Sequence, residues 1–386
     1  MKYVFYAHRK RFIPYFTKVS KNLEHSYVYT FPRLLRFFFS KPKLIDGKKQ
    51  KEITSYYVSI FDYKNKKSWL EIFLYRIFFS IKLVFVYSVI FNFYKYYKDS
   101  FIVVWGESGL VQKILQSISR AQAINNLIYM ENGFLPNTTA IDRRGLNAQC
   151  SLPRSVEFYK SLIFDDFENL LPKSLVIRDA KKGIVQKKID LSSYGDYFFI
   201  PFQCNRDSVI KSYSPFIKNM WELFDLIVEV ASQNTSINFI IKEHPSCPED
   251  YHALYEKIDS SKINNIFFMN QVNTESLIKQ STGVITINSS VGFESLLFSK
   301  PVICLGDAAY SLSGLVQSSM SLQELKDSII KIVNGTWVLD DDLNEKFLRF
   351  VYYRYLVKGT RKNMSDDHIQ SVASKLIGLT FEDKFQ

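Results

Sequence analysis

From Phe101 onward, short runs of apolar and β-branched residues alternate with longer segments in which apolar residues recur at helical spacing. Glycine or polar residues end each run, as in FIVVWG, YFFIPFQ, NFIIKEHP and GVITINSS. Strands that alternate with helices in this way pair in parallel, and the helices cover the faces of the sheet. The runs are numerous enough for two sheets, so the sequence predicts a doubly wound α/β protein with two Rossmann-like domains.

A polar, lysine-rich stretch at residues 178–194 separates the helix-like FYKSLIFDDFENLL from the strand-like YFFIPF. Domain boundaries fall in such polar linkers. We therefore expect an N-terminal domain over residues 1–190 and a second domain over residues 191–345. Residues 346–386 have the pattern of helices rich in aromatic and basic residues, and we expect them to pack back on the N-terminal domain.

Positive charge is concentrated at the start of the chain. The first 100 residues carry 20 Lys and Arg against 6 Asp and Glu, a difference of +14, while the remainder carries 30 against 32, a difference of −2. Basic residues mixed with aromatic ones favour an anionic, partly apolar surface such as a membrane. The alternative is a solvated basic face over an ordinary core. No nucleic-acid-binding signature accompanies the charge, so no nucleic-acid partner is expected.

The most apolar stretch, residues 70–94, is interrupted by Glu71, Arg76 and Lys82. Its longest uncharged run, residues 83–94, is shorter than the ~20 residues that a spanning helix needs, so we do not expect it to cross a bilayer. The first residues lack the apolar region and cleavage site of a signal peptide. The four cysteines form no CxxC pair that would indicate a disulfide framework or structural zinc. We therefore expect a cytoplasmic protein.

Polar residues follow three strands in the second half of the chain, at the edge where an open α/β sheet binds its ligands. An imidazole held before a proline, as at His244, can touch a phosphate. Hydroxyls at a helix start, as at Ser289 and Ser290, can form a phosphate site, and Tyr310 can stack on a base or sugar. A structural histidine, ordinary capping and core packing are the alternatives. The nucleotide-binding candidates are Lys242, His244, Pro245, Asn288, Ser289, Ser290, Gly306 and Tyr310.

Two carboxylates are candidates for chemistry. Asp207 follows YFFIPF and can act as a base or a covalent nucleophile, although an Asx turn or a helix N-cap is the alternative. Glu131 follows the strand NLIYM and is a candidate general base. The long polar loop after it carries arginines that can grip carboxylate or phosphate groups. The substrate-binding candidates are Gln203, Asn132, Gly133, Arg143, Arg144 and Arg154.

Four segments, in this order, resemble the capsule polysaccharide biosynthesis family, which holds Kdo transferases of capsules and a related O-antigen enzyme. They are ENGFLPNTTAIDRRGLNAQCSLPR, PFQCNRDS, KEHP and ITINSSVGFESLLFSKPVICLGDAAYSLSGL, within about residues 103–316. The ordered acidic-x-Gly, His-Pro and Ser-Ser motifs are also similar to those of bacterial sialyltransferases that use CMP-sugars. The resemblance implies a GT-B-like fold, in which two Rossmann-like domains face a cleft.

The resemblance further implies a retaining, metal-independent transfer of Kdo from CMP-Kdo, with no tightly bound cofactor. In that reaction Asp207 would attack, His244 would support the departing CMP, and Glu131 would help to activate the acceptor hydroxyl. No DxD-like pair follows a predicted strand, which favours a CMP-sugar over a UDP-sugar donor. The acceptor would be a lipid-linked glycan or a phospholipid at the inner face of the bacterial inner membrane, where the protein would be peripheral.

Three other functions fit parts of this pattern. A sialyltransferase or another CMP-sugar transferase would keep the same nucleotide site. A UDP-sugar glycosyltransferase or a nucleotide-sugar epimerase would also have two Rossmann-like halves. A non-catalytic protein of a capsule assembly or export complex would not bind CMP at all, and such a complex is also a candidate partner of an enzyme.

Overall fold

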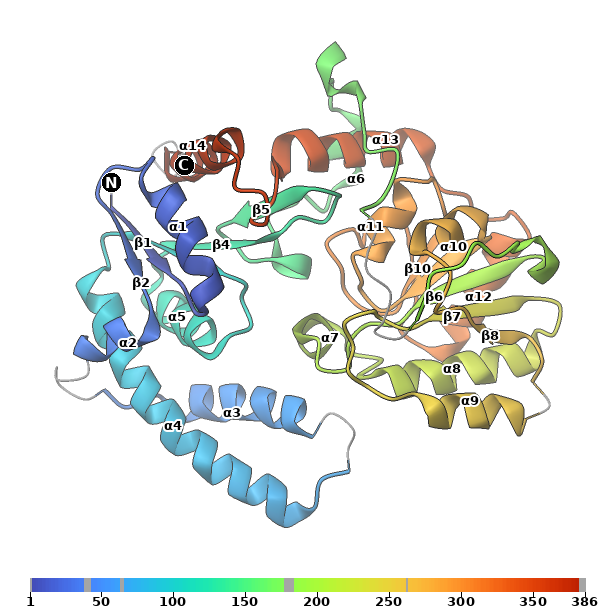
Figure 1. The fold of residues 1–386 in the computed structure, drawn as a ribbon, viewed down its shortest axis with the longest axis horizontal. Helices are drawn as coiled ribbons and strands as arrows, with labels where there is room; N and C mark the ends of the chain where they lie inside the picture. Colours follow the sequence, from blue (N-terminus) through green and yellow to red (C-terminus); the bar gives the residue numbers. More distant parts are fainter. Residues whose placement is uncertain (1, 38–42, 63–65, 177–183, 262, 382–386) are drawn as a thin grey trace. The chain divides into compact units, whose positions relative to one another are not determined.

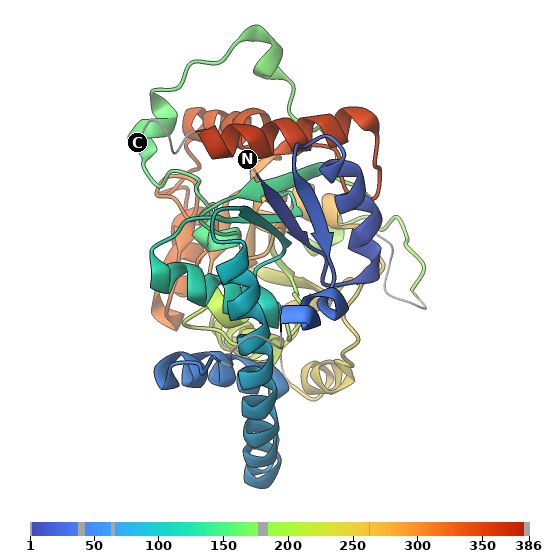
Figure 2. The same cartoon turned by 90° about the vertical axis from the view of Figure 1, so that its left-hand side faces the viewer.

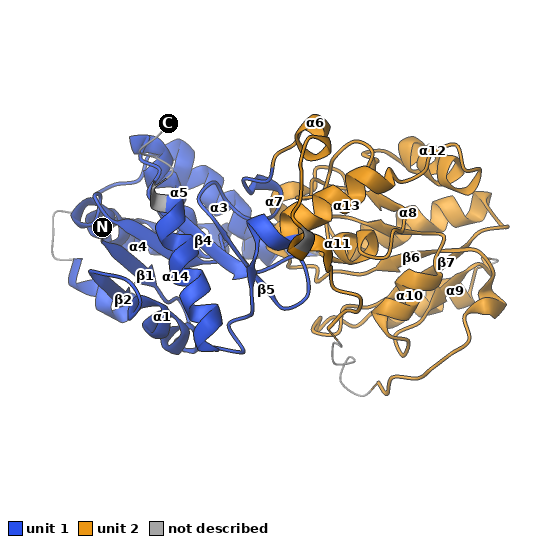
Figure 3. Ribbon diagram, turned by 90° about the horizontal axis from the view of Figure 1, so that it is seen from above, with its two compact units in different colours: residues 1–152, 352–386 blue, residues 153–351 orange. Residues whose placement is uncertain are grey.

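The computed structural model describes residues 2–37, 43–62, 66–176, 184–261 and 263–381 (Figure 1). The chain forms two compact units, which Figure 3 colours separately. Unit 1 comprises residues 1–152 and 352–386, and unit 2 comprises residues 153–351. Each unit is built on one six-stranded sheet, which confirms the predicted α/β class with two Rossmann-like domains.

Unit 2 begins earlier than the domain boundary expected near residue 190. The Arg154 guanidinium donates a hydrogen bond to the carbonyl oxygen of Ala308 at 2.7 Å. The backbone N–H of Leu175 donates to the Glu275 carboxylate at 2.8 Å. These bonds tie the segment after residue 152 to unit 2. Residues 178–183 of the expected linker lie outside the described residues.

The sheet of unit 1 has the strand order β12-β5-β4-β3-β1-β2, in which β2, β1, β3 and β4 are parallel and β5 is antiparallel to both neighbours. The sequence pattern did not indicate β1 or β2, and β5 replaces part of the expected loop. All four residues of β1 are buried, so no polar alternation marks it as a strand. The strands are β1 (Tyr3–Tyr6), β2 (Ser26–Tyr29), β3 (Phe101–Trp105), β4 (Leu127–Asn132), β5 (Thr138–Asp142) and β12 (Val357–Lys358).

The last helix of the chain, α14, packs within unit 1, whereas residues 346–351 of the expected C-terminal segment belong to unit 2. The Tyr15 hydroxyl of α1 lies 3.0 Å from Nε2 of His368 in α14. The helices of unit 1 are η1 (Lys10–Phe12), α1 (Ile13–Ser20), α2 (Phe31–Leu34), η2 (Leu35–Phe37), α3 (Gly47–Phe61), α4 (Trp69–Tyr96), α5 (Leu110–Gln122), η3 (Asn147–Gln149) and α14 (Asp366–Phe381).

The sheet of unit 2 is parallel throughout, with the order β11-β10-β9-β6-β7-β8. Alternate residues of β6 enter different cores: Phe198 and Ile200 pack with α8 and α12, while Tyr197 and Phe199 pack with α10. A strand apolar on both faces is typical of a sheet covered on both sides. The strands are β6 (Tyr197–Pro201), β7 (Asn238–Lys242), β8 (Ile266–Phe268), β9 (Gly283–Thr286), β10 (Val302–Cys304) and β11 (Gln317–Ser318).

Helices connect and cover these strands, and the strands from β6 to β10 lie at the runs that the sequence predicts. The helices of unit 2 are α6 (Val156–Lys160), η4 (Asp166–Asn169), η5 (Ser192–Tyr194), α7 (Ser208–Tyr213), α8 (Met220–Gln233), α9 (His252–Asp259), α10 (Thr274–Gln280), α11 (Val291–Leu296), α12 (Leu322–Val333) and α13 (Asp341–Arg349). A π-helix, η6 (Phe350–Tyr355), includes the second point at which the chain passes between the units.

Helix α4 is 28 residues long, and its N-terminal half extends away from the rest of unit 1 beside α3 (Figures 1 and 2). Ser68 and Glu71 form a capping box at its start. By length and composition, α4 could span a bilayer, although 33% of its most apolar window is buried. The uncharged residues 83–94 lie mainly in the core of unit 1.

Candidate functional site

Three neighbouring strands of unit 2 place the central candidates at one edge of the sheet. In the order β9-β6-β7, Ser290 follows β9, Asp207 follows β6, and His244 follows β7. Since all three strands are parallel, their carboxyl ends lie at the same edge, where ligands of α/β proteins bind. The edge therefore combines a hydroxyl, a carboxylate and an imidazole.

The imidazole of His244 has one nitrogen engaged by its own loop. Nδ1 accepts a hydrogen bond from the backbone N–H of Ser246 at 3.2 Å, and the Cys204 Sγ lies 3.5 Å from the same atom. Because Nδ1 is an acceptor, the proton of a neutral ring is assigned to Nε2. Nε2–H is then the donor that this histidine can offer to a phosphate.

Glu243 supports the loop that carries His244, a role that the sequence analysis did not assign. Its carboxylate accepts hydrogen bonds from Asn270 Nδ2 at 2.9 Å and from the Tyr255 hydroxyl. Its backbone N–H donates to Asn270 Oδ1 at 2.8 Å. Glu243 is buried, and these bonds satisfy the charge that burial would otherwise penalise.

Asp207 is the N-cap of α7, as the alternative interpretation of its motif expected. Its Oδ1 accepts from the backbone N–H of Val209 at 3.0 Å. Burial raises the pKa of the Asp207 carboxyl, and hydrogen bonds from Val209 and Gln203 and the charge of His244 oppose that rise. The influence of His244 on this pKa agrees with a position of both groups at one edge.

Gln203 and Asn288 hold this edge together. The Gln203 Nε2 donates to Asn288 Oδ1 at 3.2 Å, and the Asn288 N–H donates to Gln203 Oε1 at 3.3 Å. Asn288 Nδ2 also donates to the carbonyl oxygen of Val209 at 3.2 Å. Both amides are buried and join the ends of β6 and β9 to α7. In this structure the two amides hold the ends of these strands and the start of α7 in place around the site.

The two serines differ in their surroundings. The Ser289 hydroxyl accepts from the backbone N–H of Val291 at 3.2 Å, as in ordinary capping. Ser290 is the N-cap residue of α11, is exposed, and makes no side-chain capping bond. Of the pair, Ser290 is therefore the residue whose hydroxyl is available to a ligand.

Tyr310 is a packing residue in the structure, which corrects its assignment as a ligand contact, whereas Gly306 as a ligand contact stays a prediction. Tyr310 is 1% exposed, and its hydroxyl donates to the carbonyl oxygen of Ser289 at 2.6 Å. Its ring packs so closely on Gly292 that a Cβ there would overlap it. A Cβ on Gly306 would come within 3.2 Å of Ser214. Tyr310 has no exposed ring face on which a base could stack.

Two of the candidate arginines bind protein carbonyls. Arg143 donates to the carbonyl oxygens of Leu379, at 3.0 Å, and Asn125 within unit 1. Arg154 holds the carbonyl of Ala308 in unit 2, as described above. For Arg143, which is buried, these bonds correct its assignment as a group that grips an anion, whereas the exposed Arg154 keeps that role as a prediction. Arg144 contributes its backbone N–H to Asp142 at 2.7 Å, which leaves the role of its side chain a prediction.

The acidic-x-Gly motif lies in unit 1, at a β-hairpin. Glu131, half-buried, pairs with Ala140 across β4 and β5, and Asn132 next to it is exposed. Gly133 closes the hairpin, since a Cβ there would overlap the Thr138 side chain. Close packing within the hairpin therefore explains why this position is a glycine. Glu131 as an acid or base stays a prediction.

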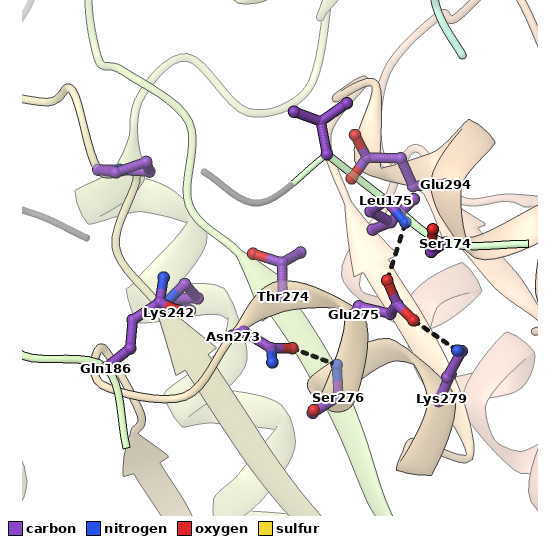
Figure 4. A pocket seen from close by; sticks show the side chains of 12 residues that line it. Ser174, Leu175, Gln186, Lys242, Asn273, Thr274, Glu275, Ser276, Lys279 and Glu294 are labelled. Carbon is purple, nitrogen blue, oxygen red and sulfur yellow. Dashed lines mark hydrogen bonds and ion pairs between the residues drawn. The ribbon is translucent and has the colours of Figure 1, made fainter. Parts of the chain in front are cut away.

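A pocket of about 400 Å³ lies in unit 2 beside the His-Pro motif (Figure 4). Among the described residues, the Lys242 Nζ donates to the carbonyl oxygens of Asn270 (2.8 Å) and Val272 (2.6 Å), and these two bonds use two of its three N–H groups. Burial lowers the pKa of Lys242 to about 8. The lining residues are Ser174, Leu175, Val176, Gln186, Lys242, Pro245, Asn273, Thr274, Glu275, Ser276, Lys279 and Glu294.

The helix start that lines this pocket was missed in the sequence analysis. Asn273 caps α10 by accepting from the backbone N–H of Ser276 at 2.7 Å, and Glu275 pairs with Lys279 at 2.5 Å (Figure 4). The capping sequence NTES directly after the strand NIFFMN could have indicated a further polar strand end. The described residues contain no group of three or more His, Cys, Asp or Glu that could hold a metal ion.

Comparisons with known proteins identify relatives of this chain. Protein FixF of Sinorhizobium fredii is 34% identical over 260 residues, which cover 67% of this chain and 60% of FixF. The capsule polysaccharide export protein KpsS of Escherichia coli is 21% identical over 277 residues, which cover 58% of this chain and 71% of KpsS. The chain therefore spans less than two thirds of the length of FixF.

Solved structures with low overall similarity include Thermosulfurimonas dismutans KpsC, a beta Kdo 2,7 transferase, with a TM-score of 0.44, 16% identity and coverage of 98% of this chain and 100% of that one. S. aureus MnaA in complex with UDP has a TM-score of 0.36 and 14% identity, over 100% of this chain and 98% of that one. The family model described as capsule polysaccharide biosynthesis protein matches residues 173–328, most of unit 2. Over these residues, the chain belongs to the capsule polysaccharide biosynthesis family.

Proposed function

We propose that this chain is a metal-independent glycosyltransferase that moves Kdo from CMP-Kdo to a lipid-linked glycan or phospholipid during synthesis of a bacterial surface polysaccharide. It would act at the cytoplasmic face of the inner membrane, with no tightly bound cofactor. The observation that carries the proposal is the edge formed by Asp207, His244 and Ser290, which lies within the residues that match the family. The implied donor, CMP-Kdo, carries a single phosphate and a carboxylate, and the site would have to bind both groups.

The proposed donor site uses polar groups at the carboxyl ends of β7 and β9. His244 Nε2–H and the Ser290 hydroxyl would donate to the phosphate, and the Lys242 ammonium would offset its charge. As the anomeric C–O bond breaks, its electron pair leaves with CMP, and these donors stabilise the developing charge. The pocket beside Lys242 would take part of the nucleotide.

The proposed chemistry is a double displacement. The ionised Asp207 carboxylate attacks the anomeric carbon and forms a glycosyl ester as CMP departs. The acceptor hydroxyl then attacks the same carbon, Glu131 takes its proton, and Asp207 leaves as a carboxylate. Two inversions give net retention.

The test measures CMP release from freshly made CMP-Kdo with lipid-linked acceptor. Asp207→Asn and His244→Gln should each lower the rate by about a hundredfold or more. His252→Gln is the matched control, because the His252 side chain is 72% exposed in the same unit. Equal rates of CMP release in wild type and Asp207→Asn would rule out Asp207 as the nucleophile. Turnover with CMP-sialic acid alone would favour the sialyltransferase alternative.

A non-catalytic role in capsule assembly or export is the second candidate, because the relative KpsS is named an export protein. It predicts no CMP binding and no effect of His244→Gln on capsule production. Protection against thermal unfolding by UDP rather than CMP would instead favour a UDP-sugar enzyme. Thermal unfolding measured with CMP and with UDP therefore separates the three outcomes.

A further inference from the structure

Helix α4 exposes a continuous apolar face over its first four to five turns. Phe78 is 67% exposed and Ile81 is 69% exposed, although they belong to a helix whose second half is core. The exposed residues recur at spacings of three and four, which places them on one side of a helix. This outer face of α4 consists of Leu70, Phe73, Leu74, Ile77, Phe78, Ile81 and Phe85, with Trp69 at its end.

The opposite side of α4 is fixed by packing on α3. The rings of Tyr75 and Phe61 stack at 4.2 Å, and those of Phe79 and Tyr57 at 4.7 Å. Phe79 is only 4% exposed. The helix thus has two apolar sides, of which α3 covers one. Soluble proteins rarely leave such a contiguous apolar surface uncovered, so the outer face points to a partner.

Basic side chains accompany this face. Arg76 and Lys82 lie on α4 between its apolar sides, and Lys66 and Lys67 precede its first turn; all are exposed. Long basic side chains can keep their charge at lipid head groups while their stems lie along apolar surface. The excess of cations in the first 100 residues, 20 against 6 acidic residues, complements an anionic surface.

The second half of α4 limits how far the helix can enter a bilayer. Leu83, Ile90 and Phe93 are fully buried, in the half of the helix that packs on the rest of unit 1. A transmembrane position would remove these side chains from the core of unit 1 and would lose their burial. The outer face can instead enter the interfacial region lengthwise, as amphipathic helices do.

We propose that the α3–α4 pair is a monotopic anchor, whose outer face inserts into the head-group and upper acyl region of an anionic bilayer. Such an anchor would account for the proposed membrane location. Only its purpose rests on the proposed function: it would hold the enzyme where a lipid-linked acceptor lies. The partner is a lipid surface, because charge complementarity and aromatic residues on one face favour it over another protein.

The experiment is flotation of the full chain with vesicles of phosphatidylethanolamine and phosphatidylglycerol, compared with vesicles of phosphatidylcholine. Phe78→Asp/Ile81→Asp should lower partition into the anionic vesicles by about tenfold or more. The matched control is Ile163→Asp/Phe167→Asp, since these side chains of unit 2 are 86% and 75% exposed. This control should bind as wild type does.

Trp69, 75% exposed, reports insertion directly. Its fluorescence should shift to shorter wavelength on binding and should be quenched by brominated acyl chains, and Trp69→Phe should remove both signals. Unchanged flotation of Phe78→Asp/Ile81→Asp would overturn the proposal. So would a wild-type dimer that this variant converts to a monomer without loss of flotation, because the face would then be a subunit interface.

Transfer to a soluble acceptor separates this proposal from the proposed function. If Phe78→Asp/Ile81→Asp loses vesicle binding but releases CMP at the wild-type rate with that acceptor, both proposals stand. If the wild type binds vesicles through α4 but shows no transfer from any CMP-sugar, the anchor stands and the enzymatic proposal fails.

Discussion

The ionisation of Lys242 ties the pocket to the proposed donor. Its side chain meets two carbonyl oxygens, and burial holds its pKa at about 8, below the ordinary 10.5. A half-buried ammonium that has no carboxylate partner among the described residues is in a position to gain from a bound anion. This arrangement makes nucleotide binding depend on pH in a direction that can be stated.

We expect CMP affinity to fall by about tenfold as the pH rises well above 8, since Lys242 loses its proton in that range. The sign follows from linkage: an anion favours the protonated lysine, so binding takes up a proton near this pKa and weakens once the proton is gone. Isothermal titration at neutral and alkaline pH measures the effect. The Lys242→Met protein should bind CMP weakly at both pH values. The Lys279→Met protein should keep the wild-type dependence of CMP affinity on pH.

At the scale of single residues, the sequence indicated which residues lie at the strand ends but not which groups they contact. His244 and Asp207 could be predicted because polar residues after parallel strands meet at one edge. Tyr310 and Arg154 could not, because a ring or a guanidinium in a loop can bind either a ligand or its own chain. Their bonds to the carbonyl oxygens of Ser289 and Ala308 are long-range contacts that residue type does not reveal.

At the scale of elements, apolar and β-branched runs identified the parallel strands β6 to β10 of unit 2, because these strands are largely buried, whereas the two-residue, partly exposed β11 had no such run. β1 was missed because its sequence, YVFY, is aromatic and stands beside basic residues. Helix α4 gave an ambiguous signal for a physical reason. Its uncharged half lies in the core, and its charged half carries the exposed apolar face. A search for uninterrupted apolar residues therefore finds the buried half and misses the half that is exposed.

Helix α11 depends on close contact between Gly292 and the ring of Tyr310. We expect Gly292→Ala to destabilise the protein by about 1–3 kcal/mol, because the added methyl forces the ring or the helix to move. Thermal unfolding followed by circular dichroism checks this. Gly378→Ala in α14 is the control, since, apart from its chain neighbours and the adjacent helix backbone, no described atom lies within 4 Å of the place that its methyl group would take, and alanine favours a helix. A stable Gly292→Ala protein would show that the contact can relax.

At the scale of the whole molecule, the chain leaves unit 1 and returns to it. Residues 352–386 complete unit 1 through β12 and α14, whose Val372 and Leu376 are fully buried. Unit 2 is a single continuous segment with helices of its own on both faces of its sheet. The proposed donor groups Asp207, His244 and Ser290 all lie in that segment, whereas the proposed base Glu131 lies in unit 1.

A fragment of residues 153–351 should therefore fold and bind CMP within about threefold of the full chain, since both faces of its sheet are covered by its own helices. The fragment should not transfer sugar, because it lacks Glu131 and the other residues of unit 1. Circular dichroism reports folding, titration reports CMP affinity, and CMP release from CMP-Kdo reports transfer. The same fragment with His244→Gln is the control for specific binding. A folded fragment without CMP affinity would mean that unit 1 completes the nucleotide site.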